Sequence, residues 1–73
     1  MPALPVISGQ ECINALCEAG YHVARQKGSH VRLLHPKRGA VTVPVHKEID
    51  RGTLRSIIRE SGLSVDEFIA LLG

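Results

Sequence analysis

Two runs of alternating apolar and polar residues constrain the fold of this chain most. The runs HVRLL at 30–34 and AVTVP at 40–44 each place alternate apolar side chains on one face of an extended strand. Between them, PKRG at 36–39 is typical of a turn, because proline presets a turn dihedral angle and glycine accepts a positive φ. A weaker alternation, YHVARQ at 21–26, precedes both runs. The pattern predicts three consecutive strands paired as an antiparallel meander.

Helix-capping patterns lie on both sides of these strands. Ser8 followed by Glu11 is a capping box, and Gly20 is the residue type that follows a helix in the left-handed conformation. Ser64 and Glu67 repeat the capping box near the end of the chain. We therefore expect one helix before the strands and a short helix at the end.

A further helix is expected between the last strand and Gly62. Gly52 and Thr53 precede LRSIIRES, so we expect Thr53 to be the N-cap of this helix. The apolar residues of this run recur at helical spacing and form one stripe. The expected core residues of the last two helices are Leu54, Ile57, Ile58, Phe68 and Leu71. This order predicts an α+β fold, a single domain over residues 1–73 with a three-stranded antiparallel sheet and its helices on one face.

An antiparallel sheet that is covered on one face leaves its other face in water. If Val31 and Leu33 point toward the helices, the alternation of strand side chains turns the residues between and before them outward. We therefore expect His30 and Arg32 to be exposed to solvent on the outer face.

The first strand does not follow a simple alternation. By parity, Tyr21 and Val23 share one face of this strand. Arg25 and Lys27 fall on the same face, and basic side chains are rarely buried without a partner. Either these two side chains extend to solvent from the strand end, or a bulge near Gly28 re-aims them.

The basic residues are concentrated in the middle of the chain, although the net charge of the 73 residues is only +2. The basic residues of this central region are Arg25, Lys27, Arg32, Lys37, Arg38 and Lys47. One face of the domain can therefore be strongly positive, which favours an anionic partner. Aromatic residues are scarce, so if the anionic partner is a nucleic acid, contact with its backbone is expected rather than base stacking.

Two groups of basic residues have two interpretations each. Lys37 and Arg38 form either a solvated turn or a contact with phosphates. Arg51, Arg55 and Arg59 recur at four-residue spacing on the expected helix. They form either a solvated helix face or a surface for an anionic partner or an RNA backbone.

Several classes of protein and site are not expected. Cys12 and Cys17 point about 140° apart on the expected helix, so they cannot pair with each other. We expect them to be small core or half-buried residues in a reducing compartment. The four histidines lack the spacing of a structural zinc site, so we expect no metal and no other cofactor. No signal peptide or membrane span is visible, so we expect a cytoplasmic protein without a membrane partner.

Four segments together resemble the HicA family of toxins from bacterial and archaeal toxin–antitoxin pairs. They are GSHVRLLHP at 28–36, VTVPVH at 41–46, EIDRGTLRSIIRESGLS at 48–64 and the opening LPVISGQECINALCEAGYHVARQKGSH at 4–30. The resemblance covers essentially the whole chain. It implies a fold similar to a double-stranded-RNA-binding domain, cleavage of mRNA without a metal cofactor, and neutralisation by a HicB-type antitoxin protein.

The resemblance also implies that the histidine of the G-S-H motif, His30, is the catalytic residue. The chain departs from the family before the G-T-L motif. Asp50 and Arg51 stand where relatives commonly carry a basic residue or proline. Because an acid disfavours contact with RNA, we exclude Asp50 from the expected binding residues.

The chemistry of RNA cleavage independently suits a histidine. RNA carries its own nucleophile, the 2′-OH, so cleavage needs one group to take that proton, one to protonate the leaving oxygen, and positive charge over the phosphate. Histidine transfers protons near neutral pH because its unperturbed pKa is about 6.5. His46 and His35 are candidates for a second proton carrier, and His46 is preferred because His35 shares the inward parity of Val31 and Leu33. His35 is expected to end a strand, and His22 to be an ordinary surface residue.

The expected RNA-binding residues lie around His30. Gly28 removes a side chain where a nucleotide backbone can approach, and Ser29 offers a hydroxyl and an amide. Arg32 shares the face of His30 and is placed to hold a phosphate. The full expected set is Lys27, Gly28, Ser29, Arg32, Lys37, Arg38 and Lys47.

A second functional class is a non-catalytic RNA-binding or regulatory module of the same fold. An enzyme loses cleavage but keeps RNA affinity when His30 is replaced, whereas a binder responds mainly to replacement of Arg32 or Lys27. In the enzyme interpretation, a HicB-type antitoxin covers the basic face around His30 and forms a hetero-oligomer with the toxin.

Overall fold

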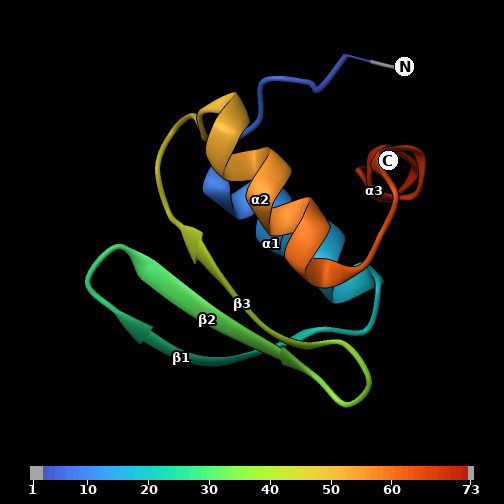
Figure 1. Cartoon of the computed structure of the whole chain (residues 1–73). Helices are drawn as coiled ribbons and strands as arrows, with labels where there is room; N and C mark the ends of the chain where they lie inside the picture. The colour runs from blue at the N-terminus through green and yellow to red at the C-terminus, as the bar shows by residue number, and fades with distance from the viewer. Residues whose placement is uncertain (1–2, 73) are drawn as a thin grey trace.

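The computed structural model of the protein describes residues 3–72 (Figure 1). The elements follow in the order α1 (Gly9–Glu18), β1 (His22–Lys27), β2 (His30–His35), β3 (Gly39–Pro44), α2 (Arg51–Ser61) and α3 (Val65–Leu71). The strands form one antiparallel sheet in the order β1-β2-β3, and the helices lie on one side of it. The predicted α+β fold, with a three-stranded meander and its helices on one face, is confirmed.

The core lies between the inner face of the sheet and the helices. Val31 of β2 pairs with Val43 of β3, and Leu33 pairs with Val41. All four side chains are buried, as the alternation predicts. The same core contains Leu16, Tyr21, Ile49, Leu54, Ile57, Ile58 and Phe68. Leu71 packs against it and is only partly buried.

The predicted capping boxes are present. The Glu11 N–H donates to Ser8 Oγ at 3.1 Å, and the Ser8 N–H donates to Glu11 Oε1 at 3.0 Å, so α1 begins after Ser8. Ser64 and Glu67 form the same reciprocal pair in front of α3. Gly20, just after α1, has a φ of 102°, a conformation that favours glycine.

The start of α2 differs from the prediction. Asp50, not Thr53, is the N-cap, and the helix begins at Arg51. The Thr53 N–H donates to Asp50 Oδ2 at 3.1 Å, and the Thr53 hydroxyl donates to Asp50 Oδ1 at 2.6 Å. Threonine and aspartate are both good N-cap residues, so the local sequence allows either start. The carboxylate prevails because it accepts two hydrogen bonds from one residue.

Replacement of Asp50 by alanine is expected to lower the Tm by several degrees, because α2 loses its cap. The hydrogen bond from the Thr53 hydroxyl and, to a smaller extent, the one from its backbone N–H hold the pKa of the Asp50 carboxyl below its usual range. The carboxylate therefore contributes stability that is complete above about pH 4 and is lost as the pH falls through the lowered pKa of the folded state. Thermal unfolding from about pH 7 to about pH 2 checks this. The Tm difference between wild type and Asp50→Ala should shrink in acid, whereas Asp50→Asn should keep most of the Tm at neutral pH.

The first strand, β1, is exposed along its whole length. Its register against β2 shifts between Val23 and Arg25, so a bulge is present, as one of the two alternatives supposed, but it lies at Ala24 and not near Gly28. Val23 pairs with Leu33, which is buried, yet Val23 itself is 52% exposed on this edge strand of the sheet. Val23 therefore lies on the inner face, the face that it shares by parity with Tyr21, but it is half exposed there.

The two cysteines differ in their environment. Cys12 is fully buried in α1, and burial raises the pKa of its thiol to about 12. Cys17 is exposed, so the expectation that it is a core or half-buried residue is wrong. Both thiols are free. Within residues 3–72, none of the helices has the length and apolar character needed to span a membrane.

Candidate active site

His30 lies exposed at the first position of β2, directly after the tight turn that joins β1 to β2. Two hydrogen bonds hold this turn. Gln26 Nε2 donates to the Gly28 carbonyl oxygen at 3.1 Å, and the Val45 N–H donates to the Ser29 carbonyl oxygen at 2.6 Å. Gly28 has a φ of 59°, and the space where a side chain would begin is open. The imidazole of His30 is therefore accessible, and hydrogen bonds fix the backbone of the turn that precedes it.

Basic side chains gather beside His30 on the outer face of the sheet. Lys27 is the cross-strand partner of His30, and Arg25 is the partner of Arg32. Side chains at such paired positions start about 5 Å apart. A shallow hollow of about 270 Å³ is lined by Arg25, Lys27, His30, Arg32 and Thr42. Its positive charge suits a phosphate group.

Arg25 belongs to this group, although strand parity placed it on the opposite face to His30. In an unbroken strand, Arg25 shares the side of Tyr21, which is buried. The bulge between Val23 and Arg25 inserts an extra residue and brings Arg25 opposite Arg32. The crowding of basic residues on one predicted face was a signal either of a bulge or of side chains that extend to solvent, and it fixed neither the choice nor the position of the bulge.

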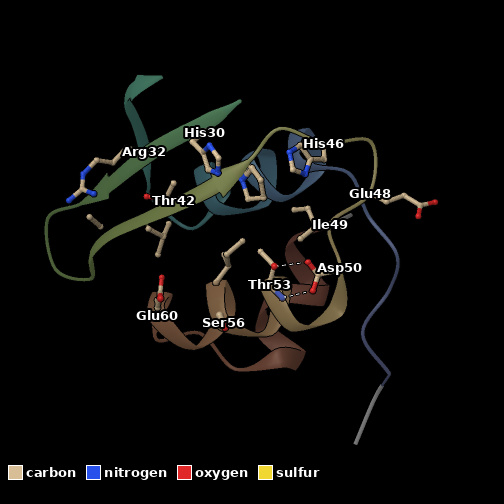
Figure 2. Close-up of a pocket in the computed structure, with 14 residues that line it drawn as sticks. His30, Arg32, Thr42, His46, Glu48, Ile49, Asp50, Thr53, Ser56 and Glu60 are labelled. Atoms are coloured by element: carbon tan, nitrogen blue, oxygen red, sulfur yellow. Dashed lines mark hydrogen bonds between the residues drawn. The ribbon is translucent and has the colours of Figure 1, made fainter. Parts of the chain in front are cut away.

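A larger groove of about 820 Å³ runs between β3 and α2 (Figure 2). His30 and Arg32 contribute to it from β2, and His46 contributes from the segment after β3. Figure 2 shows His30 and His46 above the groove and Thr53, Ser56 and Glu60 below it. The structure therefore brings the expected catalytic residue and the expected second proton carrier to one cavity.

The segment that carries His46 is attached to the start of α1. The Gly9 N–H donates to the His46 carbonyl oxygen at 2.9 Å, and the Ile49 N–H donates to the Ile7 carbonyl oxygen at 2.9 Å. Gly9 packs directly against the backbone of Pro44 and Val45, and a side chain at Gly9 would overlap the Pro44 carbonyl oxygen. The N-terminal segment thus fixes the position of the backbone at His46.

Acidic residues line the α2 side of the groove, so this side is negative whereas the side formed by the sheet is positive. They are Asp50 and Glu60, from the cap of α2 and from α2 itself, whereas the side chain of Glu48, in the segment before α2, extends away from the groove in Figure 2. An ionised carboxylate repels a phosphate, so the side of the groove formed by the sheet is the suitable one for the RNA backbone. Asp50, which is excluded from the expected RNA-binding residues, is the N-cap of α2.

The other expected RNA-binding residues are spread over two places. Ser29 is in the turn before His30, and Lys47 is exposed next to His46. Lys37 and Arg38 lie in the turn at the far end of β2, which is about 17 Å long. Arg38 Nη1 donates to the Ser61 carbonyl oxygen at 3.0 Å, which ties this turn to the end of α2. The structure does not bring Lys37 and Arg38 together with His30.

The remaining histidines lie outside the groove. The ring of His35 packs against Tyr21 with a centroid distance of 5.1 Å, and its Nε2 lies 2.9 Å from where a Gly20 side chain would begin. His35 therefore ends its strand in a structural contact, as expected. His22 is exposed at the start of β1. Within the described residues, no group of three histidine, cysteine or acidic side chains is arranged to hold a metal ion.

Comparisons with known proteins agree with this architecture. The sequence model of a family described as the HicA toxin of bacterial toxin-antitoxin matches residues 9–63, which is most of the chain. A solved toxin–antitoxin complex from Streptococcus pneumoniae contains a chain with 28% sequence identity and a TM-score of 0.69. That match covers 78% of this chain and 98% of the other. No curated protein sequence matches. The chain therefore belongs to the HicA family of toxins from bacterial toxin–antitoxin systems.

Proposed function

We propose that this toxin is an endoribonuclease that cleaves mRNA without a metal cofactor, with His30 as a general acid–base residue. The observation that carries the proposal is the exposure of His30 on the outer face of the sheet, paired with Lys27 and next but one to Arg32. An accessible proton carrier beside two fixed positive charges is what cleavage by the 2′-OH of RNA requires.

The reaction divides between the residues as follows. The 2′-oxygen attacks the neighbouring phosphorus and the bond to the 5′-oxygen breaks, which leaves a cyclic phosphate and a 5′-hydroxyl. His30 either takes the proton from the 2′-OH or donates a proton to the leaving 5′-oxygen, and His46, in the same groove, is proposed for the other of these two transfers. Lys27 and Arg32 stabilise the negative charge that develops on the phosphate. Gly28 leaves room for the RNA backbone, and Ser29 offers it polar groups.

Cleavage of an unstructured RNA in EDTA tests this proposal. Wild-type protein should cut the RNA and should leave the same sequence made with 2′-deoxyribose intact, because the deoxy strand has no nucleophile. Cleavage of both strands, or cleavage that stops when EDTA is added, would contradict the mechanism. Binding of RNA without cleavage by the wild type would instead favour a non-catalytic RNA-binding module.

Replacement of Arg25 by alanine is expected to weaken RNA binding, because Arg25 lines the basic hollow beside His30. One lost phosphate contact should lower the slope of log affinity against log salt by about 0.7 for single-stranded RNA. Fluorescence anisotropy with a labelled RNA at several salt concentrations measures this. Arg59→Ala is the matched control, since Arg59 is exposed on α2 and lines neither the hollow nor the groove. Equal slopes for the two variants would remove Arg25 from the RNA-binding surface.

An antitoxin partner follows from membership of a toxin–antitoxin family. We infer that the partner is a HicB-type protein, that it covers the basic face around His30 with acidic residues, and that the two form a hetero-oligomer in the cytoplasm, where mRNA is found. Charge complementarity supports this arrangement, because an acidic surface pairs with Arg25, Lys27 and Arg32 as RNA would. Inhibition by covering the site needs no change in the fold of the toxin.

A further inference from the structure

We propose that the groove between β3 and α2 binds one base of the RNA, and that Glu60 makes the groove prefer cytosine to uracil. The proposal rests on the proposed function, because it assumes that the RNA backbone lies beside His30. It adds a base-recognition site to a surface that otherwise contacts only phosphates.

The size and lining of the groove suit a flat base. Its volume is about 820 Å³, within the range of about 300–1,000 Å³ that is typical of small-molecule pockets. The apolar residues Pro44, Ile49 and Ile57 form the floor of the groove; each is buried and exposes only a small part of its surface there. Bases held outside a stacked strand pack their faces against apolar or aromatic side chains, so such a surface can hold one.

The charges on the two sides of the groove orient the nucleotide. His30 and Arg32 lie on the sheet side, where the phosphate is held, and Glu60 lies on the α2 side (Figure 2). Because the carboxylate repels the phosphate, the backbone stays on the sheet and the attached base extends across the groove toward α2. The edge of the base then meets the side chain of Glu60.

Glu60 is the acid of the groove that is placed to read a base. Both carboxylate oxygens of Asp50 accept hydrogen bonds from Thr53, and Glu48 extends away from the groove in Figure 2. Glu60 points from α2 toward β3 in the same view. A carboxylate only accepts hydrogen bonds, so it favours the amino group of cytosine over the carbonyl oxygen that uracil carries at the same position.

Binding of RNA that cannot be cleaved tests the inference. Two fluorescein-labelled oligonucleotides made with 2′-O-methyl ribose, one of cytosine only and one of uracil only, are titrated with the full chain. Wild type should bind the cytosine strand about tenfold more tightly, the effect of one charge-assisted hydrogen bond. Glu60→Gln should reduce the ratio to less than about twofold, because an amide can both accept from cytosine and donate to uracil. Glu18→Gln, an exposed acid at the end of α1, should keep the wild-type ratio.

The outcomes separate this inference from the proposed function. Equal binding of the two strands by wild type, or an unchanged ratio in Glu60→Gln, overturns base recognition in the groove even if the protein cleaves RNA. A cytosine preference that depends on Glu60 supports the groove as a base site even if no cleavage is found. Loss of the preference in Glu18→Gln as well would mean that net charge, and not the groove, sets the ratio.

Discussion

Replacement of His30 by alanine is expected to slow RNA cleavage by about 100- to 10,000-fold, the usual contribution of a general acid–base residue. The dissociation constant for RNA should change by less than about fivefold, because most single contacts in an interface contribute under ~1 kcal/mol. The basic side chains around His30 remain in place in this variant, so affinity and catalysis separate. Single-turnover cleavage and anisotropy binding with the same RNA measure the two effects.

Two other histidines serve as controls for this experiment. His22 is exposed on β1 and lines neither the groove nor the basic hollow, so His22→Ala should cleave as fast as wild type. His46 shares the groove with His30, so His46→Ala should reduce cleavage without changing the Tm. If His46→Ala abolishes cleavage while His30→Ala retains it, the catalytic role belongs to His46 and the proposed assignment is wrong.

Replacement of Gly9 by alanine is expected to destabilise the fold by about 2–4 kcal/mol, the upper range for overpacking against a rigid neighbour. The added carbon would lie 2.8 Å from the Val45 Cα and would overlap the Pro44 carbonyl oxygen. These are backbone atoms next to a buried strand end, so they cannot move aside as a flexible side chain would. A loss of this size lowers the Tm of a small domain by about 10–25 °C, which thermal unfolding measures.

The same change should also affect the site, because the Gly9 N–H holds the His46 carbonyl oxygen. Cleavage measured well below the reduced Tm should therefore fall, and it should fall less than in His30→Ala. Gln10→Ala is the matched control, since Gln10 is the next residue of α1 and is exposed; its Tm should change by less than a few degrees. A Gly9→Ala protein as stable as Gln10→Ala would show that the close contact between α1 and β3 relaxes without cost.

Local sequence was sufficient to predict the elements and the exposure of His30. The capping boxes at Ser8 and Ser64 depend on residues three positions apart, which is a purely local interaction. The alternation in β2 has a period of two, so burial of Val31 and Leu33 places His30 and Arg32 outside wherever the rest of the chain lies.

Other features depended on contacts between distant segments. The bulge that turns Arg25 to the side of Arg32 is a property of strand pairing, and the sequence left open whether there is a bulge or whether the basic side chains extend to solvent. Arg38 donates a hydrogen bond to the carbonyl oxygen of Ser61, 23 residues further on. This contact joins its turn to α2, and no local sequence pattern predicts it.

The sequence by itself determined the α+β class, the strand order along the chain and the outward position of His30, because caps and alternation act over a few residues. Only the tertiary structure decided that His46 meets His30 at one groove, and that Glu60 faces them from α2. These residues come from separate elements, and their meeting depends on how Gly9 lets α1 approach β3 and how α2 packs beside it. Packing between elements sets such distances, and a single sequence does not encode them in any local pattern.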